Sequence, residues 1–248
     1  MTARAKSESG GAAGSQLLLD LGHRPALERE DFLVAPSNQV AVEWIDRWPD
    51  WPQPGLALHG EAGAGKTHLA QVWRARSGAL AVTPEALLAQ EPPELLGEAD
   101  ACVLDDAEAL WALEGSQREG ERRLLHVFNM LVQRGGQLLL AGRRPPARWP
   151  VALPDLRSRL TTLPTAELGP PDEVLIEAVL VKLFADRQIT VEPAVVHYLG
   201  RRLERSFATV RALVARLDRE SLRSGRPVTV PFVRTLLEQG ADRDSAED

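Results

Sequence analysis

Residues 60–67 read GEAGAGKT, and this stretch decides the fold. It fits the pattern G-x-x-x-x-G-K-[ST] at every required position, with the apolar run LALH (56–59) before it and the amphipathic segment HLAQVWRARS (68–77) after it. Glycines let such a loop fold around a phosphate with several backbone N–H groups pointing inward, and the positive end of the following helix faces the same anion. The sequence therefore predicts a strand, a phosphate-binding loop and a helix, in that order.

The loop indicates a nucleotide ligand, ADP or ATP, bound together with Mg²⁺. Its lysine would contact the outer phosphates, and the hydroxyl of its threonine would bind the metal. A glycine turn without a ligand is the competing interpretation, and the strand–loop–helix context disfavours it. The residues of this stretch expected to contact the nucleotide are Gly60, Ala62, Gly63, Ala64, Gly65, Lys66, Thr67 and His68.

Two carboxylates end a second apolar run, ACVLDD (101–106). A magnesium–nucleotide site needs an acidic group at the end of a strand near the phosphate loop. Asp105 would hold the metal through water, and Asp106 would orient or deprotonate the attacking water. An Asp-Asp pair alone is often only a solvated strand end, but the phosphate loop favours the functional interpretation.

The rest of the chain alternates between predicted strands and helices up to about residue 170, and then becomes helical. Such alternation predicts a largely parallel sheet covered by helices on both faces. Strands are expected at 56–59, 79–83, 101–106, 137–142 and near 160–164. By periodicity, the last part contains helices only, near 173–188, 193–203, 208–224 and 231–238.

Composition narrows the classes of function. The net charge of −6 argues against a protein that grips nucleic acid over a broad surface. The one cysteine, Cys102, excludes a disulfide within the chain and a cysteine-based metal site, and the five histidines lack metal-ligand spacing. We find no signal peptide and no run of transmembrane length, so we expect a cytoplasmic protein without membrane contact.

The order of motifs along the chain resembles a known family. The motifs are the phosphate loop, the Asp-Asp strand, HVFNMLVQRGGQLLLAGRRPP (126–146), DLRSRL (155–160) and FATVRALVARLDRESLRSGRPVTVPFVRTLLEQ (207–239). Over roughly residues 16–240 the chain resembles the AAA+ module of the bacterial replication initiator DnaA. Within that group it is most similar to the short Hda-type homologues that inactivate DnaA. The resemblance implies an AAA+ phosphate-loop core with a parallel sheet and a small C-terminal helical lid.

The expected domains follow from these observations. They are a flexible arm at residues 1–24, the α/β nucleotide-binding core at 25–169, the helical lid at 170–240 and an acidic tail at 241–248.

The resemblance also assigns roles to arginines. Arg159 in RSRL would be the arginine finger that reaches a nucleotide on a neighbouring subunit, with Arg157 as the alternative. A positive group delivered in trans stabilises charge on the transferring phosphate. Arg211 in ATVRAL would be the second sensor, extending from the lid toward the β- or γ-phosphate of the nucleotide. Without the resemblance, each would be interpreted as a solvated or salt-bridged surface residue.

Two departures from the initiator pattern stand out. Gly142-Arg143-Arg144-Pro145-Pro146 occupies the place where the family usually has an acidic residue, as in SDRPP. Arginine accepts neither a proton nor a hydrogen bond, so we hypothesise that Arg143 holds nucleotide charge and slows intrinsic hydrolysis. The sequence also ends at ADRDSAED, without the helix-turn-helix domain of the initiator, so we expect no sequence-specific DNA binding.

The stretch QLLLDL (16–21) resembles the short motif by which bacterial proteins dock on the β sliding clamp of DNA polymerase III. Gln16 would enter a polar pocket, while Leu17, Leu19 and Leu21 would contact an apolar groove. A flexible arm can order itself on such a partner. A short strand or a latch on the protein's own core is the alternative.

As the resemblance implies, the protein binds ADP or ATP, docks on the clamp and promotes hydrolysis of the ATP held by DnaA, which would restrain replication initiation. Three other functions remain open as alternatives. The protein could be an autonomous AAA+ ATPase such as a helicase loader, it could be a small-molecule kinase, or it could be an initiator-like DNA binder. Oligomerisation that depends on nucleotide also remains open.

Overall fold

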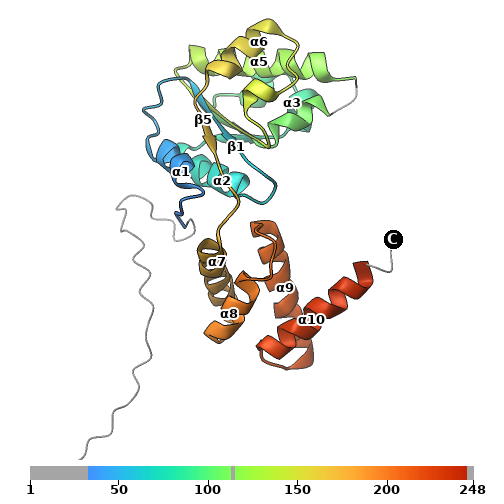
Figure 1. The fold of residues 1–248 in the computed structure, drawn as a ribbon. Helices are drawn as coiled ribbons and strands as arrows, with labels where there is room; N and C mark the ends of the chain where they lie inside the picture. Colours follow the sequence, from blue (N-terminus) through green and yellow to red (C-terminus); the bar gives the residue numbers. More distant parts are fainter. Residues whose placement is uncertain (1–32, 113–114, 245–248) are drawn as a thin grey trace, which may run out of the picture. The chain divides into compact units, whose positions relative to one another are not determined.

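The phosphate loop lies at the carboxyl end of a central strand of a parallel sheet. We describe residues 33–112 and 115–244 from a computed structural model (Figure 1). Within them five strands pair in the order β2–β3–β4–β1–β5, and every pair is parallel. The strands are β1 (Gly55–His59), β2 (Leu80–Val82), β3 (Ala101–Leu104), β4 (Gln137–Gly142) and β5 (Thr165–Glu167).

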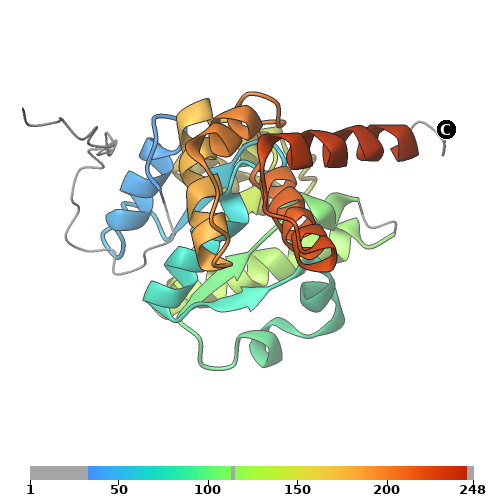
Figure 2. The same ribbon diagram turned by 90° about the horizontal axis from the view of Figure 1, so that it is seen from below.

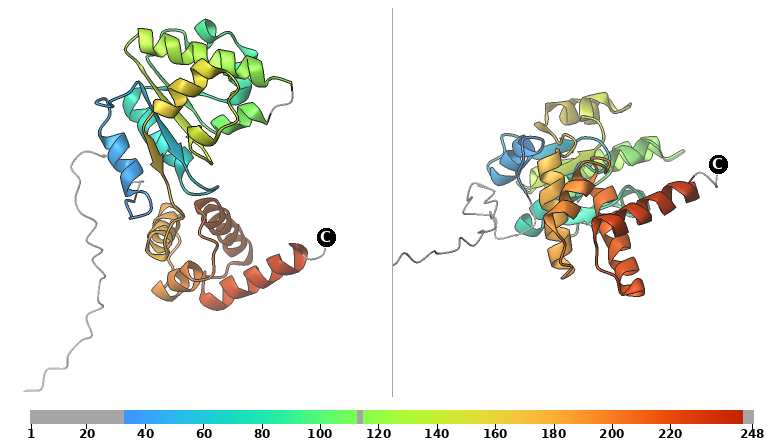
Figure 3. Two further views of the ribbon diagram at one scale, coloured as in Figure 1. Left: turned by 45° about the horizontal axis from the view of Figure 1, so that its top comes forward. Right: turned by 60° about the horizontal axis from the view of Figure 1, so that its bottom comes forward.

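Side chains on the strands alternate between two apolar clusters, one on each face of the sheet. Leu56, Leu58 and Leu139 belong to the cluster that includes Leu69 and Trp73. Leu138 and Leu140 belong to the other cluster, which includes helical leucines and Phe128. Because successive strand residues point to opposite faces, this division confirms the predicted sheet with both faces covered. The left view of Figure 3 shows α1 on one side of the sheet and α5 and α6 on the other.

The helices of this α/β part are α1 (Gln39–Asp46), α2 (Lys66–Ser77), α3 (Pro84–Ala89), α4 (Pro92–Leu96), α5 (Gln117–Gln133) and α6 (Pro154–Thr162), with short 3-10 turns η1 (Ala107–Trp111) and η2 (Pro146–Arg148). Helix α1 precedes β1, and the other helices of this α/β part connect successive strands. The hydroxyl of Thr83 caps α3, accepting from the N–H of Ala86 at 3.2 Å. The short elements α4 and η1 were not predicted.

One predicted strand is misplaced. Residues 160–162 form the last turn of α6, and the fifth strand begins only at Thr165. The β-branched threonines favoured a strand there, but Leu156 and Leu160 are both fully buried, one helical turn apart. Burial of that apolar pair and the helix-starting Pro154 outweigh the local preference for a strand.

After β5 the described chain is helical, as predicted. The helices are α7 (Glu173–Asp186), α8 (Pro193–Gly200), α9 (Phe207–Ser224) and α10 (Val230–Asp244), and Figure 2 shows them from a second side. Their inward residues form an apolar cluster of their own, which includes Leu180, Phe184, Val214 and Val233. We call residues 173–244 the lid. No helix in the described parts of the chain has the length and apolar character needed to cross a bilayer.

Candidate nucleotide-binding site

The phosphate loop adopts a backbone that only glycine tolerates at several positions. Gly60, Gly63 and Gly65 have φ values of +152°, +77° and +100°. A Cβ on Gly60 would lie 2.1 Å from the carbonyl oxygen of Leu168, so the chain that leaves β5 passes directly against the loop. Leu168 also donates its backbone N–H to the carbonyl oxygen of His59 at 2.7 Å. The loop therefore fits between its own strand and the segment that leads to the lid.

Lys66 folds back onto the loop. Its Nζ donates to the carbonyl oxygens of Gly60 at 2.7 Å and Glu61 at 2.8 Å. Burial lowers the pKa of Lys66, and the positive charge of Arg143 lowers it further, while Asp105 opposes the shift. An incoming phosphate would add negative charge beside this half-buried ammonium group.

The two predicted carboxylates face this lysine. Both Asp105 and Asp106 act electrostatically on Lys66 in the direction that raises its pKa. Asp106 has a left-handed backbone, with φ +48°, and donates its N–H to Oδ1 of Asp105 at 2.9 Å. β3 therefore ends in a sharp turn that carries two neighbouring carboxylates, and the charges of both act on Lys66 of the phosphate loop.

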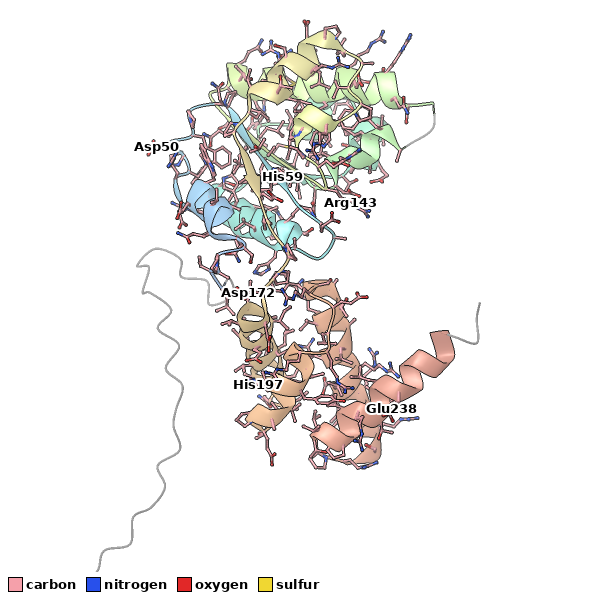
Figure 4. All side chains as sticks on the ribbon, in the orientation of Figure 1. Asp50, His59, Arg143, Asp172, His197 and Glu238 are labelled. Carbon is pink, nitrogen blue, oxygen red and sulfur yellow. The ribbon has the colours of Figure 1, made fainter. Side chains whose placement is uncertain are left out.

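The end of β4 completes this edge of the sheet. The carbonyl oxygen of Arg143 accepts a hydrogen bond from the N–H of Gly60 at 3.2 Å. Arg143 is the residue directly after β4, and its side chain is exposed. His59 and Arg143, both labelled in Figure 4, lie at the ends of neighbouring strands. An arginine therefore stands at the strand end where the initiator pattern has an acidic residue.

A cavity of about 190 Å³ adjoins the loop and includes residues of the lid. It brings together three predicted contact residues, Gly65, His68 and Arg211. Residues that sequence reasoning did not assign to the site complete the lining: Leu33, Asn38, Leu175, Val179, Lys182, Leu183, Asp186 and Phe207. The cavity is mainly apolar with a few polar groups, which suits a nucleoside.

Asn38 holds one wall of this cavity. Its side chain accepts from the N–H of Ala35 and donates to the carbonyl oxygen of Leu33, both at 2.9 Å. The structure shows that its buried amide closes the turn before α1 and does not cap the helix.

The lid meets the loop at the start of α9. Phe207 donates its backbone N–H to the carbonyl oxygen of Gly63 at 3.0 Å. A Cβ on Gly63 would lie 2.1 Å from Oγ of Ser206, and one on Gly65 would lie 3.1 Å from the ring of Phe207. Arg211 is one helical turn beyond Phe207, so this contact sets its distance from the loop.

Other residues of the loop differ in exposure. Thr67 and Ala62 are exposed, so the hydroxyl of Thr67 is accessible to a metal. Ala64 is 3% exposed and its methyl group packs in the core, so only its backbone can contact a nucleotide. Gln16, Leu17, Leu19 and Leu21 lie outside the described residues.

Arg157 and Arg159 lie on α6, away from the groups that face Lys66 and from the cavity. The guanidinium group of Arg157 donates to the carbonyl oxygen of Val151 in its own chain. The exposed Arg159 lies over the ring of Phe128, with Cζ 5.5 Å from the ring centre. Because Arg157 is held by backbone, Arg159 is the better candidate to reach a second molecule.

Comparisons with known proteins agree with this geometry. Residues 176–237 match the family model "Hda, lid domain". The chain is 26% identical over 268 residues to the chromosomal replication initiator protein DnaA of Thermomicrobium roseum, a match that covers 97% of this chain and 56% of that protein. The chain has the AAA+ fold, its sequence is similar to DnaA, and its lid matches the Hda lid model. DnaA of Nautilia profundicola is 25% identical, and that match covers 87% of this chain and 53% of that protein. The chain therefore spans about half the length of the curated relatives it matches.

Solved structures show the same AAA+ fold. Domain III of Thermotoga maritima DnaA superposes with a TM-score of 0.72 at 21% identity, over 87% of this chain and 97% of that one. DnaA from Aquifex aeolicus, solved with AMPPCP bound, gives a TM-score of 0.64 at 19% identity, over 78% of this chain and 65% of that one. The AAA+ core and helical lid expected of this DnaA-related protein are therefore present.

Proposed function

We propose that this DnaA-related protein binds ADP or ATP with Mg²⁺ and, docked on the β sliding clamp, stimulates hydrolysis of the ATP bound to DnaA. The observation that carries the proposal is the cavity that joins Gly65 and His68 of the core to Arg211 of the Hda-type lid. A ligand that contacts both parts would stabilise one arrangement of core and lid.

The described residues fit such a ligand. The loop offers backbone N–H groups and Lys66 to the phosphates, Arg211 adds positive charge from the lid, and the apolar wall receives the base. Thr67 and Asp105 would hold Mg²⁺, which would neutralise phosphate charge. Asp106 would orient water. The similar fold of Aquifex aeolicus DnaA, which was solved with AMPPCP bound, supports the proposal of a nucleotide ligand.

The stimulatory step would act on a second protein. Arg159 is exposed on α6 and would place its guanidinium group against the phosphates of the ATP held by DnaA. Charge-assisted contacts there stabilise the negative charge of the transferring phosphoryl group. Clamp docking by Gln16, Leu17, Leu19 and Leu21 would bring this arginine to DnaA on DNA.

The test measures hydrolysis by DnaA in the presence of clamp loaded on DNA and this protein. We expect stimulation that falls by at least tenfold in Arg159→Ala and in Gln16→Ala/Leu19→Ala, while Arg159→Ala still binds the clamp in a pull-down. Arg122→Ala, an exposed arginine on α5, is the matched control and keeps full stimulation. Full stimulation by folded, clamp-bound Arg159→Ala protein would contradict the proposal.

An autonomous AAA+ ATPase is the second candidate, and the electrostatic influence of Asp105 and Asp106 on Lys66 supports it. Rapid turnover by the purified protein without DnaA or clamp, abolished by Asp106→Asn, would favour it.

A further inference from the structure

We propose that Glu121 is a positioning residue that fixes the start of α6, and with it Arg159, relative to the Asp105–Asp106 turn. The inference rests on the proposed function, because the position of Arg159 matters only if this arginine acts on a second molecule. Glu121 lies on α5 and belongs neither to the phosphate loop nor to the cavity.

Glu121 is 2% exposed, an unusual position for a carboxylate. Its Oε1 accepts from the backbone N–H of Ala152 at 2.8 Å, and its Oε2 accepts from that of Leu153 at 2.7 Å. Leu153 is the residue from which α6 begins. Burying a carboxylate costs free energy unless hydrogen bonds satisfy its oxygens. Here the bonds that satisfy them hold the first turn of α6.

The same carboxylate also binds the turn that follows β3. Oε1 of Glu121 accepts from Nε1 of Trp111 at 2.8 Å. Trp111 ends η1, which begins directly after Asp106. One buried side chain therefore links the segment after the candidate metal-binding carboxylates to the helix that carries the arginine.

A second set of contacts runs parallel to the first. Glu108, also on η1, accepts through Oε1 from Nε1 of Trp149 at 2.8 Å and from the backbone N–H of Arg144 at 2.5 Å. The rings of Trp149 and Trp111 lie in contact, with centroids 5.4 Å apart. η1 therefore holds the loop after β4 at one end and the start of α6 at the other.

These contacts make a rigid path between the chain's own nucleotide site and Arg159. Packed, fully hydrogen-bonded groups move together and do not deform independently. A change at Asp105 or Asp106 on nucleotide binding is then transmitted through η1 and Glu121 to residues 152–160. Arg157 strengthens the far end, because its bond to Val151 holds the first turn of α6 to the preceding segment.

Glu121→Gln tests this role. The variant keeps the shape but replaces one accepting oxygen with an NH₂ donor, which must face a backbone N–H or the Trp111 indole. Glu119→Gln, an exposed change of equal charge on the same helix, is the matched control. Glu121→Asp keeps both accepting oxygens and should restore part of the effect.

Two readouts are compared. Hydrogen exchange of the amides of residues 152–160 is measured with and without Mg²⁺-ADP. We expect at least threefold slower exchange with nucleotide in the native protein and in Glu119→Gln, and no nucleotide effect in Glu121→Gln. Stimulation of DnaA hydrolysis should fall at least tenfold in Glu121→Gln, while its own affinity for ADP stays within twofold.

The outcomes are distinguishable. If Arg159→Ala abolishes stimulation but folded Glu121→Gln retains it, the inference fails and the proposed function stands. If Arg159→Ala retains stimulation, the proposed function fails. If, in addition, Mg²⁺-ADP still slows amide exchange of residues 152–160 in Glu121→Gln, the inference fails as well. Should Glu121→Gln not fold, Trp111→Phe, which removes one donor, must show the same loss of coupling.

Discussion

The backbone N–H of Gly60, the first residue of the phosphate loop, donates to the carbonyl oxygen of Arg143 at the end of β4 across 3.2 Å. The bond places the Arg143 side chain beside the site, where its charge also lowers the pKa of Lys66. An arginine at this point cannot activate water, but it can hold negative charge.

Arg143→Asp should weaken ADP binding by about three- to tenfold, the range for one partly exposed charge contact, and should raise the protein's own hydrolysis of ATP. Arg148→Gln, an exposed change on η2, should leave both unchanged. Titration with fluorescent ADP and phosphate release measure the two effects. If neither ADP affinity nor turnover moves in Arg143→Asp, the role assigned to Arg143 is wrong.

Gly63→Ala should separate lid and loop. The new Cβ would lie 2.1 Å from Oγ of Ser206 at a φ of +77°, so the start of α9 must move away. We expect ADP affinity to fall at least tenfold. Gly78→Ala is the matched control, because Gly78 has a φ of +70° but open space around its Cβ position, so it should cost about 1 kcal/mol of stability with normal affinity.

A second change tests whether the clash causes that loss. Ser206→Gly added to Gly63→Ala removes the obstructing hydroxyl and should recover part of the ADP affinity. Equal affinity of the single and double variants would assign the effect to backbone strain alone.

His59 should make the fold sensitive to acid. Burial lowers its pKa below the ordinary value of 6.5, Arg148 and Lys66 lower it further, and Glu167 opposes them. Just below pH 6.5 the unfolded chain therefore binds a proton that the folded chain does not, so stability falls as the pH decreases. We expect the melting temperature of His59→Gln to fall less between pH 7 and pH 5.5 than that of the native protein. His126→Gln, an exposed change, should behave like the native protein, and identical slopes in all three proteins would refute this expectation.

Cys102 should be inert in the native state. It is 1% exposed in β3, and burial raises the pKa of its thiol to about 12. Because only the thiolate reacts, alkylation by iodoacetamide at pH 8 should be slower than in denaturant by roughly 10³-fold or more. As the chain has one cysteine, mass spectrometry of the labelled fraction gives the rate directly. Rapid labelling without denaturant would show that the sheet opens locally.

The sequence predicted the parts of the site that depend on local patterns. The loop before α2 and the Asp105–Asp106 strand end are signalled by residues close together in the chain. Glu121 gave no such signal, because its partners Trp111 and Leu153 are distant in sequence and an amphipathic helix usually exposes its glutamates. Phe207 gave no signal either, because the predicted helix begins only at residue 208 and the contact of Phe207 with Gly63 joins segments more than a hundred residues apart.

The segment between β5 and α7 also limits how the lid could move relative to the α/β core. Leu168 is bonded to His59, and Gly169 donates its backbone N–H to the carbonyl oxygen of Ser37 at 2.8 Å, so the tether is anchored up to that glycine. Pro170 and Pro171 come next, with fixed φ angles, and Asp172 already caps α7. Only two residues, both prolines, therefore lie between the last anchored residue and the cap of α7, so a ligand that contacts core and lid would need to restrict very little backbone freedom there.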